Sequence, residues 1–255
     1  MGIIFASFFA LAEKSNVKLA IFGRSLRDHS EELSANLKRL DEAGIDYRYY
    51  AADVCCSESI QKTIAQITAD LGPVRTIIHG AGINRPQPLH ALSPEDFDRT
   101  AKVKVDGLGN VLNALPPVSL QLLIGYGSII AESGMHGNAD YAWANDQMGH
   151  YIERFAREQT QCRCLTLEWS IWDETGMGVS LNSIDQLKEK GVWPISVKRG
   201  VAILEQLIAD QSCAGRYIIS GRFGNIPTLK YIKHRLPIGR FIGKIKYHIP
   251  QVEVV

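Results

Sequence analysis

A repeated alternation of short apolar segments with longer amphipathic segments constrains the fold of this chain more than any other feature. Residues 17–23 (VKLAIFG) and 74–79 (VRTIIH) are apolar runs with the length of buried strands. Between such runs, Leu33, Leu37 and Leu40 recur at the spacing of one helix face. Strands that alternate with helices in this way form a parallel sheet with helices on both faces. The sequence therefore predicts an α/β fold with a doubly wound parallel sheet.

The predicted elements follow a nearly regular order, but this order opens on a helix. The expected strands are residues 17–23, 47–54, 74–79, 120–126, 164–172 and 216–220, and the expected helices are residues 1–15, 30–43, 57–71, 93–115, 138–158 and 196–210. Ser57 and Ser93 are the expected N-caps of two of these helices. A Rossmann-like fold should instead open on a strand followed by a glycine-rich turn. Only Gly2 remains of such a turn, so we expect the first strand and most of that loop to be lacking.

Charge, hydropathy and cysteine usage exclude several classes of protein. The net charge of +1 gives no general attraction to nucleic acid or to acidic membranes. The apolar N-terminal stretch has no basic segment before it and is followed directly by Glu13 and Lys14, which favours a buried helix over a signal peptide. The sequence contains no run of about 18 apolar residues, so it predicts no transmembrane helix. The five cysteines lack the spacing of a zinc site and are expected to be reduced in a cytoplasmic protein.

The last residues of the chain differ in character from the rest. Basic side chains are interspersed with apolar ones throughout residues 227–255. We interpret residues 1–226 as one catalytic domain and residues 227–255 as a basic linker that leads out of it. A docking surface is the less favoured interpretation of this tail.

Three residues at the end of the first predicted strand suggest a choice of cofactor. Gly23, Arg24 and Ser25 follow that strand directly, at the position that lies beside the adenosine ribose in dinucleotide-binding folds. An arginine at this position accommodates the 2′-phosphate of NADP, so Arg24 favours NADPH over NADH. A surface arginine at a strand end is an equally good interpretation of Arg24 taken alone.

The ends of the next two strands carry further candidate cofactor contacts. Asp53 and Val54 close the second strand, where a carboxylate can accept a hydrogen bond from the adenine amino group. Gly80, Ala81 and Gly82 follow the third strand, where small residues let the backbone approach a cofactor. Ordinary turn formation is the alternative explanation for both segments.

Ser128, Tyr141 and Asn145 form the most informative group of polar residues. Ser128 ends a predicted strand, and Tyr141 and Asn145 lie one turn apart on one face of the following helix. Reduction of a carbonyl group needs a proton donor for the developing alkoxide. A tyrosine near a cation can donate this proton, while a serine hydroxyl polarises the carbonyl. The group therefore predicts carbonyl reduction.

The segment YGSIIAESGMHGNADYAWAN resembles ketoreductase domains of type I polyketide synthases, of the iterative or enediyne-like kind, within the short-chain dehydrogenase/reductase superfamily. Most members of that superfamily have Tyr-x-x-x-Lys, whereas Asn145 replaces the lysine here. In these ketoreductases a lysine from the preceding helix compensates, and Lys104 stands at its position, with Lys102 as the second candidate. The segments LAIFGRS, HGAGINRPQPLHALSPEDFDR and LEWSIWDETGMG are also similar to the family.

This resemblance implies that NADPH delivers hydride to a β-ketoacyl thioester on an acyl carrier protein, in polyketide or fatty-acid-like biosynthesis. It further implies that Tyr141 protonates the oxyanion and that Ser128 hydrogen-bonds to it. Lys104 would lower the pKa of Tyr141 and hold the ribose, and Asn145 would support Lys104 and a relay water. Neighbouring synthase domains, among them a dehydratase, are implied as partners.

The chain departs from the family pattern at its start. The Thr-Gly-Gly-x-x-Gly-Ile loop is represented only by Gly2 and Ile3. Without the central strand before it, both neighbouring strands would keep an unpaired edge and the pyrophosphate cradle would be lost. We therefore expect a chain of this length to fold poorly or to bind NADPH weakly. A non-catalytic remnant that contacts carrier proteins and a free-standing carbonyl reductase remain the alternative functions.

Overall fold

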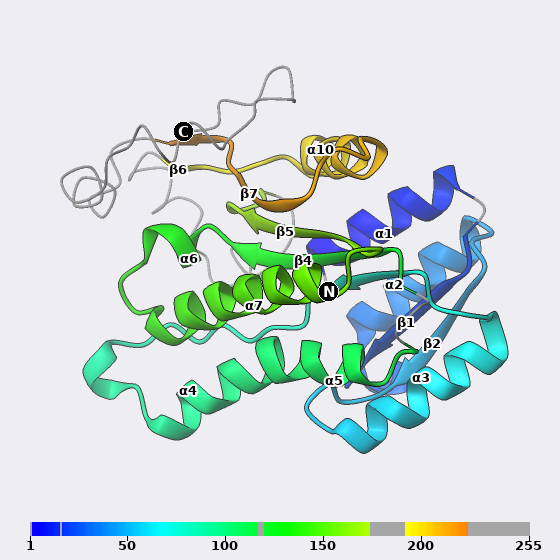
Figure 1. Cartoon of the computed structure of the whole chain (residues 1–255), viewed down its shortest axis with the longest axis horizontal. Helices are drawn as coiled ribbons and strands as arrows, with labels where there is room; N and C mark the ends of the chain where they lie inside the picture. Colours follow the sequence, from blue (N-terminus) through cyan, green and yellow to red (C-terminus); the bar gives the residue numbers. More distant parts are fainter. Residues whose placement is uncertain (1, 16, 117–119, 174–191, 224–255) are drawn as a thin grey trace.

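The computed structural model describes residues 2–15, 17–116, 120–173 and 192–223. Parallel strands form the middle of the molecule, with α3, α5 and α7 packed on one side and α1, α2 and α10 on the other (Figure 1). This arrangement confirms the predicted α/β fold of the Rossmann-like type. The predicted linker at residues 227–255 and the segment 174–191 lie outside the described residues.

Four of the predicted strands are shorter than expected, and β4 and β7 keep the expected length but are shifted along the chain. Their bounds are β1 (Leu19–Gly23), β2 (Tyr47–Ala51), β3 (Thr76–His79), β4 (Leu122–Ser128), β5 (Arg163–Trp169), β6 (Val192–Trp193), β7 (Gly215–Ile219) and β8 (Arg222–Phe223). The predicted strands 120–126 and 164–172 are wrong at their ends, because register with the neighbouring strands sets these bounds. Leu122 pairs with Arg163 and Ser128 with Trp169, so both strands end together beside the candidate site.

The helices agree with the prediction except in the middle of the chain. Their bounds are α1 (Gly2–Lys14), α2 (Glu31–Glu42), α3 (Ser57–Leu71), α4 (Pro94–Ala101), α5 (Gly107–Asn113), α6 (Ile130–Ser133), α7 (Ala139–Glu158) and α10 (Val197–Ala209), with short turns η1 (Arg27–His29), η2 (Leu89–Ala91) and η3 (Lys102–Asp106). The helix predicted over residues 93–115 is thus interrupted by η3, which is a π-helical turn. Such turns are frequent at functional sites.

Side-chain caps fix the start of several helices. Ser93 accepts a hydrogen bond from the backbone N–H of Asp96, with Pro94 as the first helical residue, as predicted. The prediction for Ser57 is wrong, because Ser57 is itself the first residue of α3. Cys56 occupies the N-cap position there and makes no side-chain cap bond.

The parallel strands form two separate hydrogen-bonded groups. One group has the order β1-β2, and the other has the order β3-β4-β5-β7. Among the described residues, β1 pairs only with β2 and β3 pairs only with β4, so each has one unpaired edge. This matches the expectation for a sheet that lacks its central strand.

Helix α1 connects the two groups of strands. The side chain of Phe5 in α1 is buried in one apolar cluster with Ile21 of β1. Ile3 and Ile4 of the same helix pack against a second cluster, which contains residues of β4 and β5. The hydroxyl group of Tyr126 in β4 donates a hydrogen bond to Ser7 over 2.7 Å. The N-terminal residues are therefore a buried helix, as the sequence predicted.

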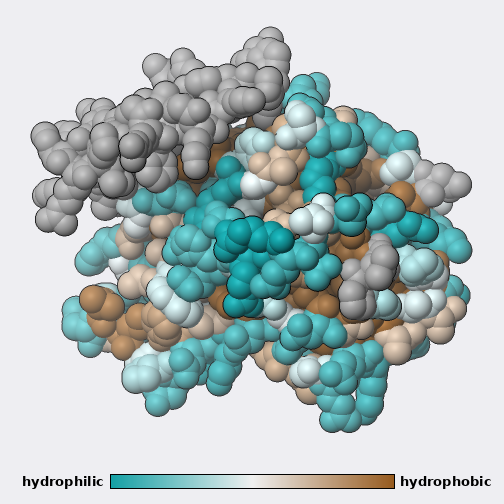
Figure 2. All heavy atoms as spheres, in the orientation of Figure 1, coloured by the Kyte–Doolittle hydropathy of each residue, from teal (hydrophilic) through white to brown (hydrophobic). Residues whose placement is uncertain are grey.

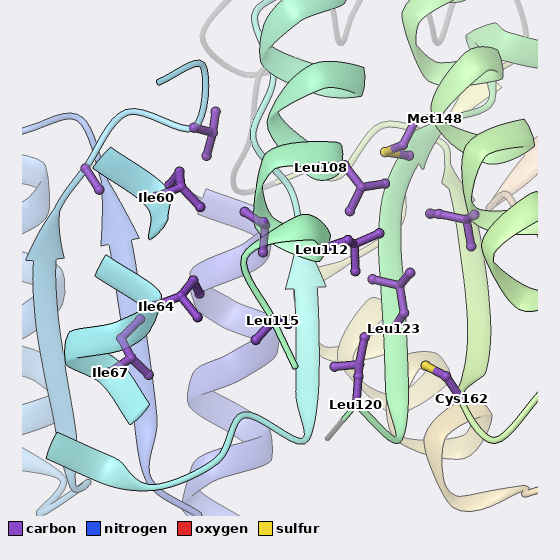
Figure 3. Packing of buried hydrophobic residues seen from close by; sticks show 14 of the residues in the cluster. Ile60, Ile64, Ile67, Leu108, Leu112, Leu115, Leu120, Leu123, Met148 and Cys162 are labelled. Atoms are coloured by element: carbon purple, nitrogen blue, oxygen red, sulfur yellow. The ribbon is translucent and has the colours of Figure 1, made fainter. Parts of the chain in front are cut away.

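A third apolar cluster packs α3, α5 and α7 against the strands, on the side of the sheet opposite α1, α2 and α10. In Figure 3, Ile60, Ile64 and Ile67 of α3 lie on one side of α5, and Leu108 and Leu112 of α5 lie on its other side, toward Leu123 of β4. The face of the molecule shown in Figure 2 is mostly hydrophilic, with a few hydrophobic residues near α4. In the described part of the chain, no helix has the length and apolar character needed to cross a membrane.

Candidate active site

Ser128, Tyr141 and Asn145 lie together where β4 ends and α7 begins. Ser128 is the last residue of β4, and Tyr141 and Asn145 lie one turn apart near the start of α7. All three side chains are buried, and Asn145 Nδ2 donates a hydrogen bond to the backbone oxygen of Tyr141 over 2.7 Å. The side chains of Asn145 and Ser128 both lie close enough to Tyr141 to lower its pKa.

Lys104 reaches the same region from the π-helical turn. Its Nζ atom donates a hydrogen bond to the backbone oxygen of Tyr126 over 2.7 Å, and its side chain is buried. A Cβ atom on Gly82 would lie 3.1 Å from Lys104 Cε, so the small residue after β3 leaves room for the lysine. Lys102, the second candidate, is exposed. The structure therefore favours Lys104 over Lys102 as the lysine of the site.

Burial dominates the electrostatics of this group. Burial raises the pKa of Tyr141 to about 12, against the lowering influence of Asn145 and Ser128. Burial also lowers the pKa of Lys104 to about 8, and the negative charge of Glu168 raises it in part. Tyr141 is thus held in its protonated form, and Lys104 can change its charge near neutral pH.

Two residues that the sequence reasoning missed are packed against Lys104 or act on it. His79, the last residue of β3, approaches the backbone oxygen of Lys104 with its Nε2 atom at 3.0 Å. Burial, together with the charge of Lys104, lowers the pKa of His79 to about 3, so its ring is neutral. Glu168 lies in β5 and is fully buried. Both stand in apolar strand segments, where no sequence pattern distinguishes them from core residues.

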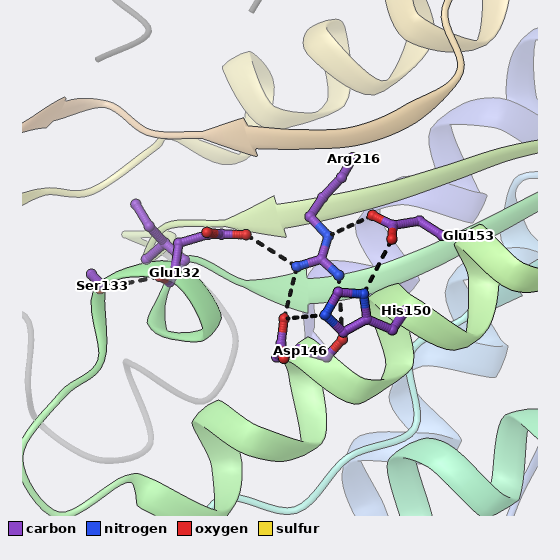
Figure 4. Close-up of polar contacts among 7 residues, drawn as sticks. Glu132, Ser133, Asp146, His150, Glu153 and Arg216 are labelled. Carbon is purple, nitrogen blue, oxygen red and sulfur yellow. Dashed lines mark hydrogen bonds and ion pairs between the residues drawn. The ribbon is translucent and has the colours of Figure 1, made fainter. Parts of the chain in front are cut away.

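An ion-pair cluster holds the turn that follows Ser128. Arg216 of β7 lies 3.0 Å from Glu132 of α6 and 3.0 Å from Asp146 of α7, and its Nε atom lies 3.4 Å from Glu153. Figure 4 shows the guanidinium group between these carboxylates, with His150 joined to Asp146 and Glu153. Because α6 begins two residues after Ser128, this cluster ties the serine turn to both α7 and β7.

The ends of β1 and β2 bring several candidate cofactor residues together. Arg24 and Asp53 both lie close enough to the thiol of Cys55 to affect its pKa, as does Asp106 from η3. The Asp53 carboxylate accepts a hydrogen bond from the Cys55 N–H over 2.9 Å, which is the geometry of ordinary turn formation. Arg24 is exposed at the strand end, so its guanidinium group is free to meet a phosphate.

The remaining candidates lie at the strand edges or on α1. Gly23 and Ser25 both accept hydrogen bonds from the hydroxyl group of Tyr49 through their backbone oxygens. The Val54 side chain is buried and its backbone oxygen accepts a hydrogen bond from Asn110, so Val54 has a structural partner already. Gly2 and Ile3 begin α1.

The end of β3 is partly covered. A Cβ atom on Gly80 would lie 1.7 Å from Cδ1 of Ile4, so the α1 side chain fills the space beside Gly80. Ala81 and Gly82 are half-buried beyond this point. Asn84, in the loop that follows, has a buried side-chain oxygen with no hydrogen-bond partner among the described residues. The unpartnered oxygen of Asn84 fits a polar ligand at the strand ends, whereas Lys104 already occupies the space over Gly82.

These residues can bind a dinucleotide and protonate a carbonyl oxygen. A basic side chain lies at the end of β1, a carboxylate follows β2, and small residues follow β3, which fits a nicotinamide dinucleotide. Tyr141 and Ser128 supply two hydroxyl groups side by side for a carbonyl oxygen. No group of residues suited to a metal ion occurs in the described ranges.

Comparison with known sequences gives a consistent assignment. The KR domain family matches residues 2–174. Polyketide synthase PksN of Bacillus subtilis is 31% identical over 214 residues, which are 82% of this chain and 4% of that protein. Phenolphthiocerol synthesis polyketide synthase type I Pks15/1 of Mycobacterium marinum is 26% identical over 187 residues, which are 71% of this chain and 9% of that protein. The chain therefore spans a small part of the length of these relatives.

Solved structures show the same fold. A ketoreductase domain from the bacillaene assembly line matches with a TM-score of 0.77 and 25% identity, over 90% of this chain and 55% of that chain. An alcohol dehydrogenase from the archaeon Thermococcus sibiricus, complexed with 5-hydroxy-NADP, matches with a TM-score of 0.72 and 21% identity, over 88% of this chain and 94% of that chain. The second likeness concerns the fold alone.

Proposed function

The chain belongs to the KR domain family found in polyketide synthases, and from this premise we propose that it reduces a β-ketoacyl thioester to the β-hydroxyacyl thioester with NADPH. The observation that carries the proposal is the buried group of Ser128, Tyr141, Asn145 and Lys104 at the carboxyl end of β4. Two neighbouring hydroxyl groups beside a buried lysine provide a proton and a hydrogen bond for one carbonyl oxygen.

In this proposal Tyr141 is the general acid. NADPH, when bound, would supply a hydride for the carbonyl carbon. The Tyr141 hydroxyl group, which burial keeps protonated, donates its proton to the oxygen as negative charge develops there. The Ser128 hydroxyl group donates a hydrogen bond to the same oxygen. Neither group has to change its protonation state before the substrate binds.

Lys104 and Asn145 act on Tyr141 in this proposal. In the resting structure the Lys104 ammonium group faces the backbone oxygen of Tyr126 rather than the phenol. Its positive charge lies in a dry region, where it can favour the tyrosinate that remains after proton transfer. Asn145 fixes the first turn of α7 through its bond to the Tyr141 backbone and keeps the phenol directed toward Ser128.

The strand ends would hold the cofactor. Arg24 and Ser25 would meet the 2′-phosphate, Asp53 would face the adenine, and Lys104 would meet the nicotinamide ribose. Gly82 carries no side chain and so leaves room for Lys104 at this end of the sheet. An acyl carrier protein would present the thioester, and neighbouring synthase domains would be its other partners, since the relatives are long synthases of which this chain spans a small part.

The test is oxidation of NADPH by the full chain in the presence of a β-ketoacyl thioester mimic. Tyr141→Phe should lower the rate by about 10²–10⁴-fold, because it removes the acid and little else. Tyr151→Phe is the matched control, since this half-buried tyrosine lies on the same helix away from Ser128. Equal rates for Tyr141→Phe and wild type would reject the assigned acid, and no NADPH oxidation by the wild type would reject the activity.

A further inference from the structure

Glu168 is a buried carboxyl group next to the candidate site that the proposed reaction does not use. It lies in the second half of β5, and its side chain is fully buried. Among the described residues, neither carboxyl oxygen has a hydrogen-bond partner. A buried carboxyl group without partners is destabilising unless it stays neutral or is compensated by nearby charge.

The sheet leaves a specific space for this side chain. Gly127 of β4 lies opposite Glu168 in the parallel register. A Cβ atom on Gly127 would lie 2.3 Å from Glu168 Oε2, so the carboxyl group rests directly on the glycine. Gly127 is flanked by Tyr126, whose backbone oxygen binds Lys104, and by Ser128. The carboxyl group therefore lies beside the strand segment that carries the candidate site.

Charged groups from three elements act on Glu168. Arg216 of β7 and Lys104 of η3 favour its ionised form, and Glu132 of α6 opposes it. The negative charge of Glu168 also raises the pKa of Tyr141 in α7. The N–H group of Ser128 in β4 lies near the carboxyl group as well. Asp146 and Glu153 of α7 act more remotely, through their ion pairs with Arg216.

We propose that Glu168 is a positioning residue for the candidate site: its carboxyl group, packed on Gly127 next to the strand residue that binds Lys104, interacts with the Lys104 ammonium group. Burial holds Glu168 largely neutral, with its pKa raised to about 8. Lys104 has its pKa lowered to about 8 by burial. Two interacting groups that titrate in the same range exchange protons as a pair. The net charge of the site would then change with pH near neutrality.

The charge of the Glu168 carboxylate determines the direction in which it shifts the pKa of each neighbouring group. An ionised Glu168 raises the pKa of Lys104 and keeps its ammonium group charged to higher pH. It also raises the pKa of Tyr141, which makes the phenol a weaker acid. Replacing the carboxyl group with the isosteric amide in Glu168→Gln should therefore lower the titration midpoint of Lys104 by about 1 pH unit.

The first test does not depend on enzyme activity. The full chain, labelled with ¹³C at lysine Cε and glutamate Cδ, is titrated by NMR, and Lys104 is assigned from Lys104→Met. In the wild type, the Lys104 and Glu168 signals should each show two inflections, because each group responds to the other. In Glu168→Gln, Lys104 should titrate in one step at lower pH, and Glu168→Asp should move it back toward the wild-type value. Independent single-step titrations in the wild type, or an unchanged Lys104 midpoint in Glu168→Gln, would overturn the proposal.

The second test rests on the proposed reduction and separates a positioning role from a merely structural one. The alkaline limb of the kcat/KM profile should shift by about 1 pH unit to lower pH in Glu168→Gln, with a rate near that of the wild type at pH 6. A uniform loss at every pH, with no shift of the limb, would overturn the positioning role. If the wild type lacks the reduction while Lys104 still shifts by NMR, the proposed function fails and the Glu168–Lys104 pair stands.

Discussion

Replacing Arg216 with methionine tests whether one guanidinium group holds the serine turn to the sheet. The methionine keeps much of the apolar volume of the stem and removes the charge. The ion pairs to Glu132 and Asp146 are 3.0 Å long and the one to Glu153 is 3.4 Å long. All three carboxylates are left close together without their cation. The variant should therefore be less stable, chiefly through α6 and α7.

The magnitude depends on how much water reaches these groups. The arginine side chain is 14% exposed, and its three partners are 31–37% exposed. Fully exposed ion pairs contribute about 0–1 kcal/mol each, while removing one partner of a buried pair costs about 3–5 kcal/mol. A cluster between these limits should lose about 2–3 kcal/mol, which corresponds to about 4–12 °C in Tm for a chain of this size.

The assay is urea unfolding followed by circular dichroism at pH 7, together with thermal unfolding. Lys62→Met is the matched control, because Lys62 pairs with Glu58 over 2.8 Å while both side chains are 76% exposed. This control should change the stability by less than about 0.5 kcal/mol. Arg216→Lys should fall between the two, since lysine keeps the charge but lacks the fork of donors. A loss for Arg216→Met no larger than that of the control would refute the reasoning.

Individual contacts elsewhere in the molecule lead to three more expected outcomes. Gly127→Ala should lower the free energy of unfolding in urea by about 1–3 kcal/mol, because the new Cβ atom would lie 2.3 Å from Glu168 Oε2. Adding Glu168→Ala should restore part of this loss, and strictly additive losses would contradict the contact. Burial lowers the pKa of His79 from 6.5 to about 3, so the unfolded chain takes up a proton first as the pH falls and stability is lost below about pH 6.5. Because Glu168 shifts the stability in the opposite direction over this range, the readout is the difference between proteins: from pH 7 to pH 5 the free energy of unfolding of the wild type should fall by about 2 kcal/mol relative to that of His79→Gln, and equal changes in both proteins would exclude this assignment. Arg24→Ala should raise the KM for NADPH about tenfold and leave that for NADH unchanged, and a parallel rise for both cofactors would count against a 2′-phosphate contact.

Local patterns were sufficient for the parts of the fold that depend on neighbouring residues. Helix α2 buries Leu33, Leu37 and Leu40, as their spacing predicts. The cap at Ser93 was readable because the serine, the following proline and the acidic first turn lie together in the sequence. The same rule failed at Ser57, because Cys56 has the extended backbone of the N-cap. A suitable side chain favours a cap, but the backbone decides which residue takes the position.

The strand bounds and the π-helical turn needed the assembled structure. The apolar runs at 120–126 and 164–172 suggest strands, but pairing between β4 and β5 ends both at Ser128 and Trp169. The sequence KVKVD has no mark of a π-helical turn, although this turn directs Lys104 toward Tyr126. Register and helix interruptions depend on contacts between distant segments, which a local pattern does not contain.

The sequence by itself was enough to indicate the protein family and to select the residues of the candidate site. Tyr141 and Asn145 share a helix face by their spacing alone, and Ser128 ends the strand before them. Only the tertiary structure decided what surrounds them. His79 and Glu168 are unremarkable members of apolar strands until burial and the charge of Lys104 act on their protonation. The effect of one charge on another depends on their distance in space and on the exclusion of water, and neither can be derived from the order of the residues.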